Sequence, residues 1–416
     1  MQERPRLRAV EAFPVEQEGK TLFYLKDPQN LAQPLGISPP GYFILSRFDG
    51  RHSLVDIQEA YCKQFGTLLL ANELKQFIDL LDRHYYLDSA RFLRHRNGVV
   101  EKFKRQPVRA AAHAGSVYPR DPAALKAQLD GYFLPPHGPG LPSPDTQNAA
   151  PRAIVAPHID FHRGGPTYGW AYKGLAESEG ADLYILLGTS HCGGKNPFII
   201  TFKDFDTPLG PVKTDKAFLR RLQETCREDL LQDEFLHQGE HSLEFQVLFL
   251  KYVARQRAEA RGEEEKPFKI VPILVSSFHS MVLRQLLPEK HPPVRTFIQA
   301  LQELVAQESR RICFVAGVDL AHVGKQFGDF EPITPEFLKW VEAEDRLLIE
   351  KLAALDAPGF FQEIAKDRDK RRICGFAPLY SFIHLLDGNH GRTLRYDQAF
   401  TPETGSAVTF TSMVFE

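Results

Sequence analysis

The chain has 416 residues, 43% hydrophobic and 25% charged, a composition typical of a globular protein large enough for two or three domains. Its 51 basic and 53 acidic residues leave a formal net charge of -2, which excludes a global electrostatic preference for nucleic acid or an anionic membrane. The N-terminal residues lack the apolar region of a signal peptide, and no run of about 18 apolar residues is available to span a bilayer. We therefore expect no nucleic-acid partner and no membrane partner.

The five cysteines are an odd number, widely separated and without paired spacing: Cys62, Cys192, Cys226, Cys313 and Cys374. This pattern predicts free thiols rather than a disulfide framework. Because free thiols are typical of a reducing compartment, we expect a cytoplasmic protein.

Residues 1–95 are predicted to form a small α+β domain of the size of a winged helix. Residues 54–66 place apolar side chains at helical spacing behind Ser53, a favourable N-cap, and residues 71–87 repeat the pattern. The short strand or hairpin pieces expected around these helices lie within residues 41–53 and 85–93.

Two composition breaks follow. Residues 96–109 are charged and poor in apolar periodicity, which predicts a linker before a second domain at 110–416. Residues 134–152 are rich in proline and glycine, but they lie between an expected helix and an expected strand. We therefore interpret them as a long surface loop rather than a domain boundary.

The second domain alternates short apolar runs with amphipathic or capped helices. This alternation predicts an α/β fold, in which helices sandwich a mainly parallel sheet. Residues 393–400 and 406–416 alternate apolar and polar side chains, as antiparallel strands added at a sheet edge do. The central strands are expected within residues 152–158, 182–188, 268–275 and 311–319, and the best-marked helices begin at Asp121-Pro122, after His241 and at Thr334-Pro335.

Residues able to bind a metal or move a proton follow three of these strands. In an open α/β sheet, the loops at the carboxyl ends of parallel strands meet at one edge, so residues from different strands can converge there. A single histidine is more often structural than a ligand, but three successive strand ends carrying His or Asp are hard to explain by chance. The positions predicted to converge are His158, His191, Asp319, His322 and Cys374.

Neutral imidazoles with one thiolate or carboxylate suit Fe(II), Cu or Zn far better than Mg or Ca, so a metal site is the economical interpretation. Glu240, His241 and Asp160 are candidates to hold the ligands in orientation. An equally good interpretation of Glu240 is an acid that the helix dipole favours in the first turn.

Two interpretations of Cys374 stay open. The first is an inert, buried thiol. The second is a metal ligand or redox-sensitive thiol, whose pKa would be lowered by Arg371, Arg372 and the following helix if the thiol is partly exposed.

Six sequence blocks resemble a known family. They are "AAHAGSVYPRDPAALKAQLDGYF", "RAIVAPHIDFHRGG", "LLGTSHCGG", "GEHSLEFQ", "FVAGVDLAH" and "RRICGFAPLY", and they occur in the order and approximate spacing of the Memo family, whose bacterial and archaeal members are called AmmeMemoRadiSam system protein B. The resemblance covers residues 110–416. It implies a fold similar to that of the class III extradiol dioxygenases, which are non-haem iron enzymes.

The resemblance also implies roles for individual residues. The family's metal ligands fall on His158, His191 and Cys374. The chain departs from the more widespread form of the first histidine block at residues 159–163, where an Ala-Gly-Tyr run is frequent, and this difference bears on the substrate pocket. The residues expected to handle protons or orient the ligands are Asp319, His322, His241 and Glu240, and those expected in the substrate pocket are His113, Asp160, His162, Arg163 and Cys192.

The N-terminal domain resembles, through fewer residues, the PqqD-like winged helices that bind leader peptides of ribosomally made, modified peptides. The resemblance rests on the turn at 46–50, the helix from Leu54 and the segment "FIDLLDRHYYL". It implies peptide capture by strand addition beside a helix. A DNA-binding winged helix is the rival interpretation, but the stretch 71–88 is mixed or acidic rather than basic. A docking domain with neither ligand is the third.

Three functions are compatible with these observations. The first is a metal-dependent redox protein that uses Fe(II) or Cu, with Zn as the alternative metal, on a small-molecule or peptide substrate. The family's system name suggests a radical-SAM protein as its partner. The second is a non-catalytic metal- or peptide-binding adaptor whose N-terminal domain docks a partner. The third is a Zn-dependent hydrolase with Glu240 as the general base.

Overall fold

The computed structural model describes residues 3–17, 19–143, 148–388 and 390–416. The chain divides into two compact units, Met1–Arg105 and Gln106–Glu416, each with its own core. Within the described ranges, no helix combines the length and the apolar character needed to cross a bilayer.

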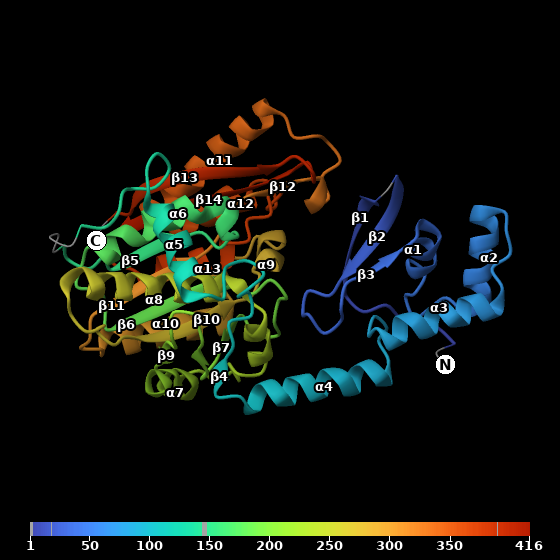
Figure 1. The fold of residues 1–416 in the computed structure, drawn as a ribbon, viewed down its shortest axis with the longest axis horizontal. Helices are drawn as coiled ribbons and strands as arrows, with labels where there is room; N and C mark the ends of the chain where they lie inside the picture. The colour runs from blue at the N-terminus through green and yellow to red at the C-terminus, as the bar shows by residue number, and fades with distance from the viewer. Residues whose placement is uncertain (1–2, 18, 144–147, 389) are drawn as a thin grey trace. The chain divides into compact units, whose positions relative to one another are not determined.

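The smaller unit has an antiparallel sheet followed by helices, as expected for a small α+β domain (Figure 1). The sheet order is β1-β2-β3, so β1 and β3 are its edge strands. The elements are β1 (Glu11–Gln17), β2 (Lys20–Lys26), β3 (Leu35–Ile37), α1 (Pro39–Leu45), α2 (Leu54–Phe65), α3 (Ala71–Arg83) and α4 (Ala90–Arg105).

The strands of this unit do not lie where the sequence pattern placed them. The expected strand piece at 41–53 is instead mainly helix α1, because Ser38 caps its N-terminus and Pro39-Pro40 fix the first turn. The piece expected at 85–93 forms only an isolated bridge between Leu7 and Leu87 before α4 begins. Both segments were misjudged because aromatic and β-branched residues suit either structure when they are buried.

Two other expectations in this region have clear outcomes. Helix α2 begins behind Ser53, whose side chain accepts the Asp56 amide in a capping box, as the sequence predicts. The segment 96–109, expected as a linker, consists mostly of the second half of α4 and the short strand β4 (Val108–Arg109).

The larger unit contains the predicted mixed, mainly parallel sheet. Strands β5, β11, β6 and β10 are parallel neighbours, while β14, β12, β13 and β7 run antiparallel to the strands they pair with. The C-terminal hairpin therefore extends the parallel strands at one side, as expected. The strands are β5 (Ala153–Ala156), β6 (Leu183–Thr189), β7 (Phe198–Ile200), β8 (Asp204–Phe205), β9 (Lys213–Thr214), β10 (Lys269–Val275), β11 (Ile312–Gly317), β12 (His322–Gly324), β13 (Arg392–Thr401) and β14 (Ser406–Phe415).

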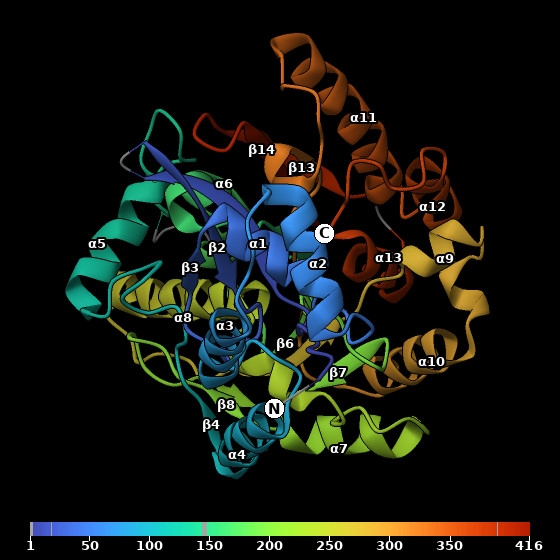
Figure 2. The same cartoon turned by 90° about the vertical axis from the view of Figure 1, so that its right-hand side faces the viewer.

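Helices cover both faces of this sheet, which confirms the predicted sandwich. Figure 2 shows α5 and α8 to the left of β6, and α10 and α13 to its right. The helices are α5 (Pro122–Phe133), α6 (Phe161–Ala176), α7 (Lys216–Thr225), α8 (His241–Arg261), α9 (His279–Leu283), α10 (Pro292–Ala306), α11 (Pro335–Ala353), α12 (Ala357–Ala365) and α13 (Phe376–Leu385). The segment 134–152, expected as a surface loop, connects α5 to β5, and its residues 144–147 lie outside the described ranges.

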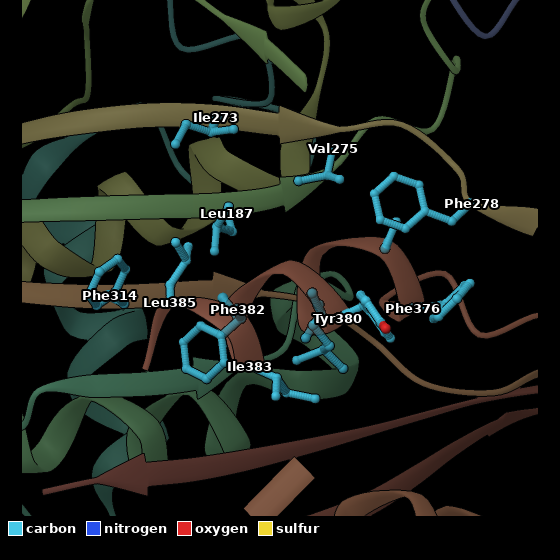
Figure 3. Packing of buried hydrophobic residues seen from close by; sticks show 14 of the residues in the cluster. Leu187, Ile273, Val275, Phe278, Phe314, Phe376, Tyr380, Phe382, Ile383 and Leu385 are labelled. Carbon is cyan, nitrogen blue, oxygen red and sulfur yellow. The ribbon is translucent and has the colours of Figure 1, made fainter. Parts of the chain in front are cut away.

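Each central strand is apolar throughout because its side chains enter two different cores in turn. Leu186 points into the core under α5, α6 and α8, whereas Leu187 points into the core under α10 and α13. In that second core Leu187 lies between Ile273 of β10 and the side chains of α13, which include Leu385 and Phe382 (Figure 3). Burial on both faces explains the continuous apolar runs in the sequence. The two cores fix the sheet, so the loops at its carboxyl edge have a rigid base.

Candidate metal centre

The candidate site lies at the carboxyl ends of the parallel strands. His158, His191 and Asp319 each follow a strand by two residues, after β5, β6 and β11 respectively. His241 is the first residue of α8, and Cys374 lies two residues before α13. These five residues come from distant parts of the chain, and the sheet brings them to one edge.

Three histidines form a group that could hold a metal ion. One ligand atom from each of His158, His191 and His241 lies within 4.8 Å of the other two. The ring centroids are 4.9 Å apart for His158 and His191, and 4.7 Å apart for His191 and His241. His158 is buried, whereas the His191 side chain is 35% exposed, so the group is open to solvent on one side.

The hydrogen bonds of two rings show which nitrogen of each carries the proton. Nδ1 of His158 lies 3.0 Å from the Gly317 carbonyl oxygen and can only donate to it. Nδ1 of His191 lies 2.9 Å from Oε1 of Glu240 and donates to this carboxylate. Nε2 is therefore the unprotonated nitrogen of both rings, which is the tautomer expected of a metal-binding histidine held by an outer hydrogen bond.

Glu240 connects two of the histidines. It caps α8 by accepting the Ser242 amide, and it also accepts the backbone amide of His191 at 2.9 Å. Nδ1 of His241 lies 3.3 Å from the same carboxylate. Burial opposes the charge on Glu240, but the adjacent His191 and His241 outweigh it and hold the pKa of the carboxyl well below its usual range. Glu240 thus acts both as a helix cap and as the acid that orients His191.

A second buried acid, Glu244, lies one turn further along α8. Its carboxylate accepts hydrogen bonds from Arg109 at 2.5 Å, from Tyr118 at 2.5 Å and from the His113 amide at 2.9 Å. Arg109 in turn donates to the Glu240 carbonyl oxygen at 2.8 Å. This network was not predicted from the sequence. The available signal was the spacing of Glu240 and Glu244, since residues four apart share one face of a helix.

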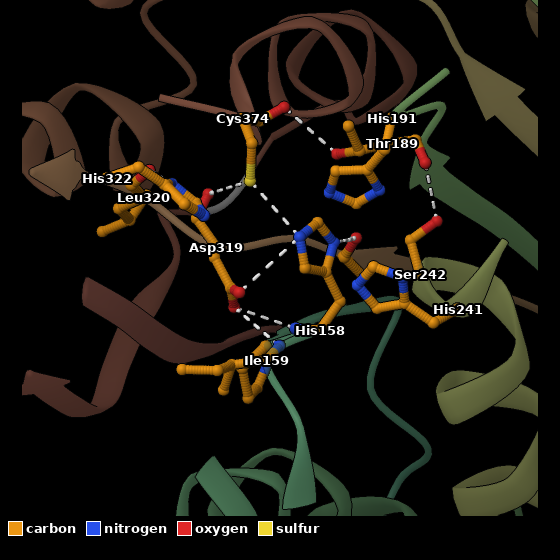
Figure 4. Close-up of polar contacts among 12 residues, drawn as sticks. His158, Ile159, Thr189, His191, His241, Ser242, Asp319, Leu320, His322 and Cys374 are labelled. Carbon is orange, nitrogen blue, oxygen red and sulfur yellow. Dashed lines mark hydrogen bonds and ion pairs between the residues drawn. The ribbon is translucent and has the colours of Figure 1, made fainter. Parts of the chain in front are cut away.

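Asp319 and His322 lie on the other side of His158 (Figure 4). Oδ1 of Asp319 accepts the backbone amides of His158 and Ile159, and Oδ2 lies 3.6 Å from Nε2 of His158. Burial raises the pKa of Asp319 to about 6, against the opposing effect of His322. Burial lowers the pKa of His322, whose Nδ1 lies 3.1 Å from the Leu320 carbonyl oxygen.

Cys374 faces the same nitrogen of His158. Its Sγ lies 3.3 Å from Nε2 of His158, as Figure 4 shows. Burial, together with Asp319, raises the pKa of this thiol well above its usual range, which is opposite to the lowering proposed from the sequence. The two arginines do not act on the thiol because their charges are taken up elsewhere: Arg371 pairs with Asp345, and Arg372 pairs with Asp329.

The residues expected in the substrate pocket are divided between two places. His113 lies beside His241, with ring centroids 5.8 Å apart, and its Nε2 is 3.0 Å from the Gly239 carbonyl oxygen. Asp160 caps α6 and forms an ion pair with Arg163 at 2.6 Å, so it does not contact the histidine group as a supporting acid. His162 is exposed on α6, and Cys192 is partly buried directly after His191.

The charge state of the group suits metal binding. Burial lowers the pKa values of His158 and His241 well below the usual range of histidine. The neighbouring His191 is the second cause of this lowering. Both rings are therefore neutral at neutral pH, so a metal ion does not have to displace protons from them. Neutral imidazoles with a nearby carboxylate and a thiol fit a transition-metal ion.

Comparison with known proteins agrees with this architecture. The family model described as "Memo-like protein" matches residues 109–414. A MEMO1 family protein of Aquifex aeolicus is 30% identical over 396 residues, which cover 94% of this chain and 96% of the relative. Since this match is longer than the unit Gln106–Glu416, it extends into the smaller unit.

Archaeal relatives match a shorter part of the chain. MEMO1 family protein MK0963 of Methanopyrus kandleri is 28% identical over 294 residues, covering 69% of this chain and 91% of the relative. MEMO1 family protein PF1638 of Pyrococcus furiosus is 31% identical over 261 residues, covering 62% and 80%. Together with the family model, which spans nearly the whole larger unit, these matches show that the chain belongs to the Memo family.

Proposed function

We propose that the protein is a metal-dependent redox protein that uses iron or copper and acts on a small-molecule or peptide substrate. The observation that carries the proposal is the convergence of the three histidine rings beside the Cys374 thiol, with two of the rings held through Nδ1 by hydrogen bonds. His158, His191 and Cys374 would hold the metal, with His241 as the adjacent imidazole. A bound iron or copper ion would supply electron transfer with dioxygen as the oxidant.

The chain's own residues would then position the substrate and handle its protons. Asp319, with a pKa raised to about 6, can hold a proton just below neutral pH at Oδ2, the oxygen that faces His158. His322 presents Nε2 as a second acceptor, because its Nδ1 is bonded to the Leu320 carbonyl. His113 borders the site beside His241 and would contact the substrate.

The state of Glu240 weighs against the Zn-dependent hydrolase. A general base needs a free carboxylate oxygen beside the attacking water. Both oxygens of Glu240 are bound to His191, one at its ring and the other at its backbone amide, and the side chain is only 6% exposed. Glu240 is better suited to orient a ligand than to activate water.

The first test is elemental analysis of anaerobically purified wild-type protein beside His191→Ala. We expect near-stoichiometric iron or copper in the wild type and loss of at least nine-tenths of it in the variant. His162→Ala is the matched control, since this histidine is exposed on α6 away from the group. The wild-type protein should then consume dioxygen with some catechol-like or peptide substrates. Absence of metal after reconstitution with Fe(II), Cu(I) and Zn would refute the proposal.

Cobalt substitution separates the candidate ligand sets. A thiolate bound to Co(II) gives a near-ultraviolet charge-transfer band, which Cys374→Ser should remove. His241→Ala should leave that band in place and change only the ligand-field spectrum. If the band is absent from the wild-type protein, three imidazoles hold the metal without the thiol. That result would refute the assignment of Cys374 as a metal ligand.

A second candidate is a non-catalytic adaptor in which the smaller unit docks a peptide or a radical-SAM partner. The observation that favours it is the position of β1, a seven-residue strand at the edge of its sheet whose described side chains are mostly exposed, to which an extended peptide can add. Under this proposal, His191→Ala should retain full partner affinity in a binding titration. A parallel loss of metal and of partner binding would refute it.

A further inference from the structure

Helix α4 carries a concentration of positive charge that the proposed metal chemistry does not use. Its 16 residues, Ala90–Arg105, contain six lysines and arginines and a single acid, Glu101. The residues outside this helix together carry a formal net charge of -7, since the helix carries +5 and the whole chain -2. The charge is thus local to this helix.

The basic residues lie mostly on one face. With about 100° of rotation per residue, Arg91, Arg94, Lys102 and Arg105 fall within roughly 80° of arc and span about 21 Å along the helix. All four are exposed, whereas Phe92 and Phe103 on the opposite face are 6% and 2% exposed. We call these four residues the basic stripe. It faces solvent because the apolar face of α4 is the buried one.

Most of the charge on the stripe is not neutralised by the protein. Arg91 pairs with Asp82 at 3.4 Å, and the neighbouring Lys104 pairs with Glu101 at 3.3 Å. Throughout the described ranges, no carboxylate lies within ion-pair distance of Arg94, Lys102 or Arg105. Gly98 occupies the middle of the stripe, where a side chain would meet open space, so a partner can approach the helix backbone there.

The surroundings of the stripe favour a narrow, extended anion over a nucleic acid. Phe92 and Phe103 of α4 are buried, and the half-buried ring of His95 is already stacked on Tyr85, so the helix offers no open ring on which a base could stack. Helix α3, which packs against α4, carries Glu73, Asp79 and Asp82. These acids would repel a broad polyanion such as a duplex, but they leave room for a single extended chain.

We propose that the basic stripe of α4 binds an extended acidic segment of a partner protein. At about 3.3 Å per residue, a segment of roughly six or seven residues spans the stripe. Alternating carboxylates on that segment would face Arg94, Lys102 and Arg105. This surface lies on a helix, apart from the edge strand β1, and the inference does not depend on the metal proposed above.

The test is fluorescence anisotropy of the full chain with a fluorescein-labelled peptide of eight glutamates, at low and at moderate salt. We expect saturable binding that weakens roughly tenfold between about 50 and 300 mM NaCl, since exposed charges are screened over this range. The triple variant Arg94→Glu, Lys102→Glu, Arg105→Glu should bind at least tenfold more weakly. The milder Arg94→Gln, Lys102→Gln, Arg105→Gln variant should show an intermediate loss.

The matched control reverses three exposed cations of the larger unit, Arg220→Glu, Arg227→Glu and Lys339→Glu, with the same change in net charge. It should bind the peptide within twofold of wild type. An equal loss in the control would show general electrostatic attraction and overturn the proposal, as would no binding at low salt. A DNA duplex or single-stranded RNA that binds tenfold more tightly than the peptide, and loses affinity in the α4 variants, would overturn the choice of partner.

Discussion

Two buried acids near His158 have pKa values that are shifted in opposite directions. The pKa of Glu240 is held well below its usual range, whereas that of Asp319 is raised to about 6. Both are nearly inaccessible, at 8% and 2% exposure, so the depth of burial does not explain the difference. Glu240 accepts hydrogen bonds on both oxygens and faces two histidine rings, while Asp319 receives its backbone donors on one oxygen only.

The acids of the two ion pairs behind Glu240 and Asp319 also have pKa values shifted in opposite directions. Arg109 and Glu244 support the Glu240 side, where burial opposes the charge on Glu244 but Arg109 and other donors keep its pKa low. Arg371 and Asp345 support the Asp319 side, where burial outweighs Arg371 and raises the pKa of Asp345 to about 6. The balance between burial and the donors around each acid therefore decides which acids keep their charge. One side of the site is permanently charged and the other can take up protons near pH 6.

Removing Arg109, which supports the Glu240 side of the site, should have the largest effect on the free energy of unfolding. Arg109→Met leaves Glu244 buried and ionised without its main partner, which we expect to destabilise the fold by about 3–5 kcal/mol in urea unfolding at pH 7. Arg371→Met should cost less, because Asp345 can bind a proton and lose its charge. Equal losses in the two variants would contradict the difference between the two sides.

The Asp319 side of the site, which includes Asp345, should make the stability of the fold depend on pH. Because the folded-state pKa of Asp345 is about 6 and its ordinary value is 3.8, the folded state holds this proton more tightly than the unfolded state does. The contribution of Asp345 to stability is complete below about pH 4 and is lost as the pH rises to 6, on the order of 3 kcal/mol in all.

Asp345→Asn should remove that part of the slope between pH 4 and 6, measured by urea unfolding of chelator-treated protein. The variant will be less stable overall, since Arg371 loses its partner, but its pH profile should be flatter. Glu336→Gln, an exposed acid on the same helix, is the control and should leave the slope unchanged. An unchanged slope in Asp345→Asn would assign the effect to another group.

Amide substitution of the two flanking acids should separate their roles. In Glu240→Gln one oxygen becomes an NH₂ group, which must oppose a donor of His191, so we expect metal affinity to fall roughly 10- to 100-fold. In Asp319→Asn the remaining oxygen can still accept both backbone amides, and the loss should be under about threefold. Chelator competition measures both affinities. A larger loss in the Asp319 variant would reverse the assignment of the supporting acid.

The smallest effect should come from the contact that links the two sides. The Thr189 hydroxyl, at the end of β6, donates to the Cys374 carbonyl oxygen at 3.1 Å. Thr189→Val keeps the shape but leaves that carbonyl unpaired, at a cost of about 1 kcal/mol in unfolding free energy. Metal content should not change, and a measurable loss of metal would show that this contact sets the position of Cys374.

Much of the fold could be predicted because it depends on local and periodic features. The continuous apolar runs of β5, β6, β10 and β11 exist because both faces of these strands are buried, and this pattern is visible without coordinates. Helix starts at Ser53, Asp121 and Thr334 follow from capping chemistry within four residues. The N-terminal strands escaped prediction because short segments of aromatic and β-branched residues do not distinguish strand from helix.

The sequence alone determined which residues can do chemistry at this site. His158, His191 and Asp319 each follow an apolar run, and the rule that parallel strands end at one edge was enough to group them. The tertiary structure alone decided what each residue faces: His241 joins the imidazoles, Asp160 turns to Arg163, and the arginines before Cys374 are bound elsewhere. Orientation and pKa depend on donors that are distant in the chain, and only packing brings those donors within hydrogen-bond distance.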